Sequence, residues 1–317
     1  MANDNQNPEW VRIDPDQVLH YIPDPKAYEG KKAEIENQYQ ALASARELGD
    51  HRAQGTHLLN LGIIFAFLFS FEKAIEMYAQ AIEIFSGIGD YSEAAHGLSL
   101  VADVYASMAQ IKRAIRTHEK SLIAYRELGD RSAQAKELAA MGLLYFTSGQ
   151  MQRALEYHKP SLTLFREIGD RRQEAKALNS IGVSYMASGQ VKNVLDPLEQ
   201  AVAIFHELGE SEEEGNALLN LSTYYNEQGQ QECAMEVANQ AIGIFRTLGN
   251  RHREAMTLRN MGSIYARLKQ LDKALETTQM SVEIYDEIGG APGDDGAREQ
   301  LETLQKRAAK KWWQVWI

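Results

Sequence analysis

The chain of 317 residues has little that would support a disulfide-stabilised or membrane-spanning fold. Cys233 is its only cysteine, which excludes an internal disulfide and a cysteine-rich zinc cluster. The longest apolar run, from Leu61 to Phe71, is interrupted by Gly62 and Ser70 and is too short for a membrane helix of about 20 residues. The first residues lack the basic start and apolar core of a secretory signal. We therefore expect a cytoplasmic protein.

Charge and motifs exclude further classes of function. The net charge of −11 disfavours nonspecific binding to nucleic acid. The sequence contains no HExxH motif and no glycine-rich phosphate loop. His118 and His158 are 40 residues apart, and we interpret them as one repeated packing position rather than as metal ligands. We expect the carboxylates on solvated faces or at helix caps and Cys233 as a buried, inert thiol, and we predict no enzymatic activity, metal or cofactor.

A glycine that recurs at a fixed interval dominates the sequence. Leu-Gly or Ile-Gly pairs recur every 40 residues, at Gly49, Gly89, Gly129, Gly169, Gly209, Gly249 and Gly289. Glycine often ends a helix because it adopts the left-handed conformation without steric cost. The next residue is usually one that caps the following helix, namely Asp50, Asp90, Asp130, Asp170 or Asn250. Each Gly-Asp step therefore predicts the end of one helix and the start of another.

A second break divides each repeat into two helices. It reads Ser-Gly-Gln at 148–150 and 188–190, and Gln-Gly-Gln at 228–230. Within the first helix of the third repeat, Leu138, Gly142 and Tyr145 share one face, so the small residue lets the paired helices approach closely. We predict an all-α fold without a stable β-sheet.

These residues resemble the tetratricopeptide repeat. The family pattern of an apolar residue, glycine, an aromatic three residues later and alanine early in the second helix is present as Leu61-Gly62-Phe65-Ala74, Met141-Gly142-Tyr145-Ala154, Ile181-Gly182-Tyr185 and Met261-Gly262-Tyr265-Ala274. The lengthened repeat is similar to that of Pins-type adaptors and kinesin light chains. The resemblance implies a right-handed superhelix, or α-solenoid, of antiparallel helix pairs that binds protein or peptide partners.

The repeat also predicts the boundaries along the chain. We expect an extended N-terminal segment at 1–30 and a half repeat at 31–50, whose residues Ala41, Ala45 and Leu48 cover the first full repeat. Six units follow at 51–90, 91–130, 131–170, 171–210, 211–250 and 251–290. A loop and a capping helix are predicted at 291–312, with a tryptophan-rich tail at 313–317.

Helical geometry predicts which side chains line the groove of such a solenoid. The first unit presents the apolar residues Leu59, Ile63 and Phe67, whereas later units present amides and cations. Our candidate partner-binding residues are Asn60, Ile63, Phe67, Lys136, Lys176, Asn179, Asn220, Asn226, Arg259, Asn260 and Arg267.

Asparagines in register suggest how a partner would be held. A carboxamide both donates and accepts hydrogen bonds, so Asn60, Asn220 and Asn260 could bind the backbone of an extended peptide. Arg259 and Arg267 favour a partner segment with carboxylates. We predict a protein-interaction adaptor; the alternative is a peptide-responsive sensor or regulator whose curvature changes when the ligand binds.

Three further features of the sequence lead to predictions. Residues 8–25 combine prolines with apolar side chains, and we expect them to cover the apolar start of the groove unless that patch is an open partner site. Pro160 and Pro197 should lie inside second helices and kink them. In the tail, Trp312, Trp313 and Trp316 follow basic residues, which fits either contact with a membrane interface or docking of the tail on the last repeat.

Overall fold

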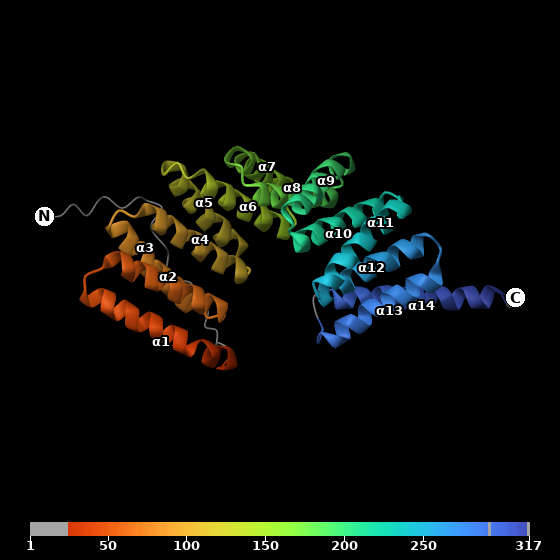
Figure 1. Cartoon of the computed structure of the whole chain (residues 1–317), viewed down its shortest axis with the longest axis horizontal. Coiled ribbons are helices and arrows are strands. Elements are labelled where there is room, and N and C mark those ends of the chain that lie inside the picture. Colours follow the sequence, from red (N-terminus) through yellow and green to blue (C-terminus); the bar gives the residue numbers. More distant parts are fainter. Residues whose placement is uncertain (1–24, 291–292, 316–317) are drawn as a thin grey trace. The chain divides into compact units, whose positions relative to one another are not determined.

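The computed structural model describes residues 25–290 and 293–315, and the side chains of residues 29–290 and 293–309. The described residues form fourteen α-helices and one short 3₁₀ helix, with no strand among them. This confirms the all-α prediction for that part of the chain. The chain divides into two compact units, residues 1–169 and 170–317, which are coloured red to green and green to blue in Figure 1.

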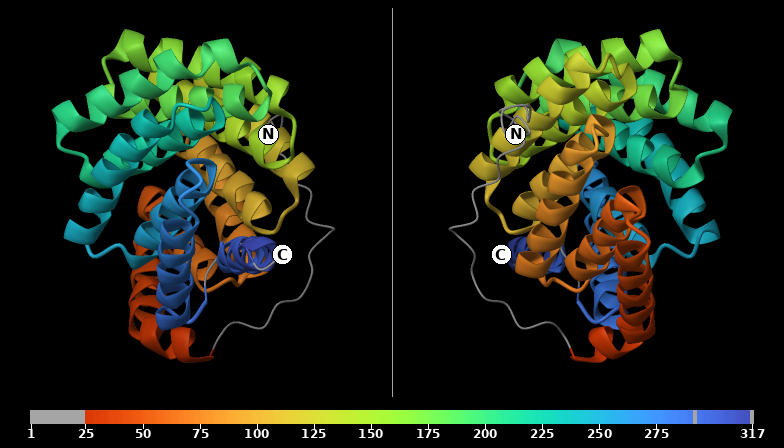
Figure 2. Two further views of the ribbon diagram at one scale, coloured as in Figure 1. Left: turned by 90° about the vertical axis from the view of Figure 1, so that its right-hand side faces the viewer. Right: turned by 90° about the vertical axis from the view of Figure 1, so that its left-hand side faces the viewer.

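Both units are built from antiparallel helix pairs. The N-terminal unit contains α1 (Pro25–Glu47), α2 (His51–Phe67), α3 (Phe71–Gly87), α4 (Tyr91–Ser107), α5 (Ile111–Glu127), α6 (Arg131–Thr147) and α7 (Met151–Ile168). The C-terminal unit contains α8 (Arg171–Ala187), η2 (Val191–Asn193), α9 (Leu195–Leu208), α10 (Ser211–Glu227), α11 (Gln231–Thr247), α12 (Arg251–Arg267), α13 (Leu271–Glu287) and α14 (Asp294–Val315). Within each unit, consecutive helices pack side by side (Figure 2).

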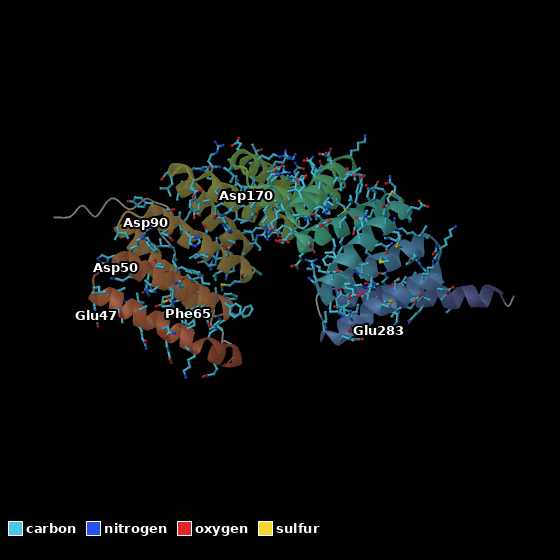
Figure 3. The ribbon with its side chains drawn as sticks, in the orientation of Figure 1. Glu47, Asp50, Phe65, Asp90, Asp170 and Glu283 are labelled. Atoms are coloured by element: carbon cyan, nitrogen blue, oxygen red, sulfur yellow. The ribbon has the colours of Figure 1, made fainter. Side chains whose placement is uncertain are left out.

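Local chemistry explains where the helices begin and end. The glycine that closes each repeat is left-handed, with φ between 66° at Gly249 and 81° at Gly289. The next side chain then caps the following helix: Asp50, Asp130 and Asn250 accept a hydrogen bond from the backbone N–H three residues later, at 2.9, 2.9 and 3.1 Å. Figure 3 labels three of the capping aspartates, Asp50, Asp90 and Asp170. The predicted caps are confirmed.

In the first helices α2, α6, α8 and α12, a glycine makes room for a side chain of the second helix. A Cβ atom at Gly62 would lie 2.3 Å from the ring of Tyr78, and one at Gly142 would lie 2.5 Å from His158. In the second repeat the corresponding pair is Ala102 and His118, and both histidines are buried. The predicted shared packing position is therefore confirmed.

Two expectations for the start of the solenoid need correction. The helix α1 begins at Pro25, so residues 25–30 are helical rather than extended, as suits a proline in the first turn. Its buried residues are Ile35, Leu42 and Ala45, whereas Leu48 is exposed, as are the leucines before the closing glycine in later repeats, such as Leu128 and Leu248. Residues 8–24 lie outside the described residues.

The two prolines behave differently from each other. The helix α7 continues through Pro160 from Met151 to Ile168. Pro197, in contrast, is the third residue of α9, after the 3₁₀ turn at Val191–Asn193. A proline in the first turn removes no helical hydrogen bond, since those N–H groups have no partner within the helix. Pro197 therefore lies within its helix as predicted, but in the first turn, where it does not remove a helical hydrogen bond.

The capping helix is present as α14. Leu304 is buried in it, and Leu301 and Ala308 are half-buried. The side chains of Trp312, Trp313 and Trp316 lie outside the described part. No helix in that part has both the length and the apolar character needed to cross a membrane.

Candidate functional site

A pocket in the C-terminal unit brings together five of the predicted partner-binding residues. It has a volume of about 350 Å³ and lies between α10, α12 and the capping helix α14, which contributes Gln300. The predicted residues that line it are Asn220, Asn226, Arg259, Asn260 and Arg267. We call this the C-terminal pocket.

The asparagines of the C-terminal pocket also connect neighbouring repeats. The Asn220 side chain donates from Nδ2 to Oδ1 of Asn179, at 2.9 Å. The Asn260 side chain donates from Nδ2 to the hydroxyl of Ser222, also at 2.9 Å. Their recurrence at one helical position therefore has a stacking role as well as a place on the pocket wall.

Asn226 supplies a buried polar group to the same pocket. Its residue is 5% exposed, and its side-chain Oδ1 has no hydrogen-bond partner among the described residues. Its backbone carbonyl accepts a hydrogen bond from Nη1 of Arg267 at 2.6 Å, which anchors that guanidinium at the pocket. A buried acceptor without a partner costs about 1–3 kcal/mol.

The two arginines of the C-terminal pocket differ from most arginines of this unit. Within the described part of the chain, neither Arg259 nor Arg267 forms an ion pair. Arg251, by contrast, donates to Glu254 at 2.6 Å. Glu227 is the one carboxylate on the described pocket wall, so the positive charge there exceeds the negative charge by one.

The ion pairs outside the pocket perturb titration. Burial raises the pKa of Glu254, but hydrogen bonds from Arg246 and Arg251 outweigh this effect and lower the pKa below its usual value. In the same way Lys176, which we expected to extend a ladder of positive groove residues, pairs with Glu213 at 3.4 Å. Glu213 also pairs with Arg172 at 3.2 Å, so Lys176 shares this carboxylate with a second cation.

The predicted apolar patch of the first unit is smaller than expected. Ile63 and Phe67 are exposed by 46% and 67%, and Asn60 is half-buried. Leu59, however, is buried. A Cβ at Gly97 would lie 3.6 Å from its Cδ2 atom, so the stacked helix α4 covers it. The expectation that Leu59 faces an open groove was wrong.

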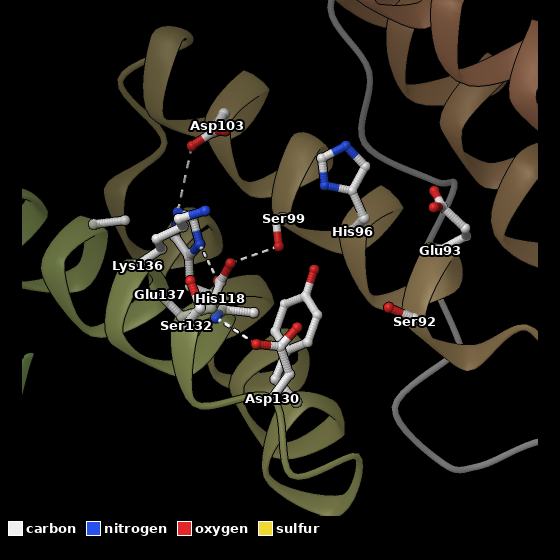
Figure 4. A pocket seen from close by; sticks show the side chains of 13 residues that line it. Ser92, Glu93, His96, Ser99, Asp103, His118, Asp130, Ser132, Lys136 and Glu137 are labelled. Carbon is white, nitrogen blue, oxygen red and sulfur yellow. Dashed lines mark hydrogen bonds and ion pairs between the residues drawn. The ribbon is translucent and has the colours of Figure 1, made fainter. Parts of the chain in front are cut away.

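Sequence reasoning missed a second pocket, in the N-terminal unit. It has a volume of about 530 Å³, and its wall includes Lys136, Glu137, His118 and Asp103 from α4, α5 and α6 (Figure 4). Glu137 is buried, contrary to the expectation that carboxylates are solvated or serve as caps. Glu137 lies four residues before the core residue Met141, on the same face of the helix, and this spacing would have predicted its burial. We call this the N-terminal pocket.

The structure places the single cysteine and the potential metal ligands as follows. Cys233 is exposed on α11, so the prediction of a buried thiol was wrong. No group of three or more potential metal ligands occurs within the described residues.

Comparison with known proteins identifies the repeat. The family model of the tetratricopeptide repeat matches residues 35–87 and 134–207. No relative matches among curated proteins. The matched residues, which lie in helix pairs described above, are thus tetratricopeptide repeats.

Several solved structures share the fold. BtubC from P. vanneervenii is 20% identical, with a TM-score of 0.64, over 69% of this chain and 92% of that one. A putative kinesin light chain with TPR-like repeats from Podosopora anserina is 20% identical, with a TM-score of 0.52, over 61% of this chain and 95% of that one. A Rap protein complexed with Competence and Sporulation Factor is 17% identical, with a TM-score of 0.55, over 82% and 76%. The kinesin light chain-like repeats thus belong among the similar folds.

Proposed function

We propose that this chain is a non-catalytic adaptor that binds a carboxylate-bearing segment of a partner protein in its C-terminal pocket. The observation that carries the proposal is the pair Arg259 and Arg267, which line the pocket without an ion pair among the described residues. Most other arginines of that unit have a carboxylate partner, as Arg251 does.

The chemistry of the pocket wall supports this ligand class. A guanidinium presents a planar fork of donors that matches a carboxylate, and such charge-assisted hydrogen bonds are about twice as strong as neutral ones. Gln300 donates to the backbone carbonyl of Arg259 at 3.2 Å and so ties the arginine-bearing helix to α14. The site is therefore held by packed helices rather than by loops, which reduces the entropy lost on binding.

The amides would recognise the backbone of the segment. Asn220 and Asn260 each use a donor within the protein, and their remaining polar atoms are available to peptide groups. Glu227 limits the ligand, since a segment that is acidic throughout would meet repulsion from this carboxylate. A single carboxylate flanked by neutral residues fits best.

A peptide-responsive regulator is the second candidate. The observation in its favour is the shared fold with a Rap protein that was solved with Competence and Sporulation Factor. A regulator would change shape when its ligand binds, whereas an adaptor would not. Small-angle scattering with and without the bound segment separates the two.

A peptide array tests the carboxylate preference directly. Each peptide would be paired with a copy in which Asp and Glu are replaced by Asn and Gln. We expect the double variant Arg259→Ala/Arg267→Ala to lose the difference between the paired peptides. The control, Arg116→Ala/Arg126→Ala, removes two exposed arginines of α5 and hence the same charge. If both variants bind acidic peptides as the unmodified protein does, the proposal fails.

A further inference from the structure

Three large apolar side chains at the end of α2 are open to solvent. Ile63 and Phe67 lie one helical turn apart on α2, and Phe69 follows in the turn that leads to α3. The Phe69 residue is 59% exposed, similar to the other two. Exposed apolar side chains that lie close together mark a surface that another segment covers. We call these three residues the α2 patch.

The backbone conformation of Phe69 is unusual for an aromatic residue. Its φ is 57°, in the left-handed region, where a bulky side chain is disfavoured. Later repeats have glycine at the same place, as Gly149, Gly189 and Gly229. The Phe69 ring lies 5.9 Å from that of Phe71, between centroids, and still remains mostly exposed. The first repeat therefore keeps an aromatic side chain where the backbone disfavours it, as is common at binding surfaces.

The first turn of α1 lies level with the α2 patch. The helices α1 and α2 pack side by side and run in opposite directions (Figure 1). Near the end of α1, Gln54 donates from Nε2 to the backbone carbonyl of Ala45 at 3.2 Å. Toward its start, Nζ of Lys31 lies 5.5 Å from the centre of the Phe67 ring. Pro25, the first residue of α1, is about 9 Å further along the helix axis, so the preceding chain joins α1 beside the end of α2.

The chain that precedes α1 has side chains of matching chemistry. Seven residues of the range 8–24 are aliphatic or aromatic, namely Trp10, Val11, Ile13, Val18, Leu19, Tyr21 and Ile22. Three more are prolines, which restrict the backbone and so reduce the entropy lost on binding. An extended chain spans about 3.3–3.6 Å per residue, so Leu19 is within about 20 Å of Pro25. The apolar residues nearest to α1 can therefore reach the α2 patch.

Attachment to α1 favours this segment over a separate molecule. The binding of a tethered segment is intramolecular, and with a short linker its effective concentration is in the millimolar range. A second copy of the chain, or a free partner, would need a comparable concentration or a higher affinity to compete.

We propose that residues 8–24 dock on the α2 patch through their apolar side chains and act as an intramolecular ligand of the N-terminal unit. A protein that binds at the α2 patch must then displace this segment. The proposal is independent of the C-terminal pocket, since it concerns another surface and apolar rather than charged groups.

Hydrogen exchange of the full chain, followed by mass spectrometry, tests the docking. We expect the amides of residues 8–24 to exchange at least about tenfold more slowly than random-coil rates. The variants Ile63→Ser and Phe67→Ser remove apolar surface at exposed positions and should restore fast exchange. The matched control is Leu143→Ser, because Leu143 is 55% exposed and occupies the repeat position of Ile63 two repeats later. This control should keep the protection.

The variant Phe69→Gly separates docking from folding. Because glycine occupies this position in later repeats, the variant should keep its helical circular dichroism signal and yet lose the protection of residues 8–24. The variant Arg259→Ala/Arg267→Ala should keep the protection, so failure of the proposed carboxylate site would not affect the result.

Three results would overturn the inference. The first is exchange of residues 8–24 at random-coil rates in the unaltered chain. The second is equal protection in Phe67→Ser, Phe69→Gly and the control Leu143→Ser, or its loss in all three. The third is protection that rises with protein concentration together with a dimer in sedimentation, since the occupant would then come from a second copy.

Discussion

The close approach of Gly62 to Tyr78 predicts a specific loss of stability. A Cβ added at Gly62 would lie 2.3 Å from the Cε1 atom of the Tyr78 ring. That ring is among the largest fully buried side chains, so it has little room to withdraw. The added methyl group must therefore displace the paired helix α3.

The magnitude follows from comparison with a glycine in open space. Replacing glycine by alanine in a helix normally gains up to about 1 kcal/mol, whereas overpacking a core costs about 1–3 kcal/mol. Gly87, at the end of α3, has no atom within 4 Å of an added Cβ. Gly62→Ala should therefore be less stable than Gly87→Ala by about 1–3 kcal/mol, because the propensity gain is common to both.

Urea denaturation followed by circular dichroism measures this difference. Repeat proteins can lose cooperativity, so the comparison uses the urea midpoint of the first transition rather than a global free energy. The double variant Gly62→Ala/Tyr78→Leu should recover part of the loss, since leucine faces glycine in the pair Gly182 and Leu198. If Gly62→Ala is as stable as Gly87→Ala, the packing argument is refuted.

Three other predictions concern titration, capping and the N-terminal segment. Burial lowers the pKa of His158 to about 4, so as the pH falls below 6.5 the unfolded chain binds this proton before the folded chain does, and the free energy of unfolding falls. His158→Leu should remove this loss, which reaches about 3 kcal/mol at pH 4. Equal slopes of unfolding free energy against pH in the two proteins would contradict this. Asp130→Ala should cost about 1 kcal/mol through loss of its cap, measured as a lower urea midpoint than that of the exposed control Glu127→Ala. Amides of residues 8–25 should be protected from hydrogen exchange if the segment covers the patch of Ile63 and Phe67; random-coil exchange rates, together with loss of partner binding in Phe67→Glu, would support the open site instead.

Local features of the fold could be predicted from the sequence alone. Gly49 ends a helix and Asp50 starts the next because each acts on backbone groups within four residues of itself. The same holds for the pairing of Gly62 with the second helix of its own repeat, since the turn between the helices is short. Such contacts recur in most units, and the period of 40 residues makes them visible.

The candidate sites were only partly predictable. Helical phase correctly placed Arg259, Asn260 and Arg267 on one face, and the structure shows that they line one pocket. The phase did not reveal that Asn220 bonds to Asn179, or that Lys176 is paired with Glu213. Those contacts join residues about one repeat apart, and they depend on how far each stacked helix is displaced along its neighbour.

Burial of polar groups was decided by tertiary structure alone. Leu59 is covered because α4 crosses it, and Glu137 is buried because His118 and Ser99 from two other helices supply its hydrogen bonds. A carboxylate in an amphipathic helix is stable in either setting, exposed to water or buried with donors. The choice depends on side chains that the helix meets only after stacking, and so the periodicity of a single helix could not decide it.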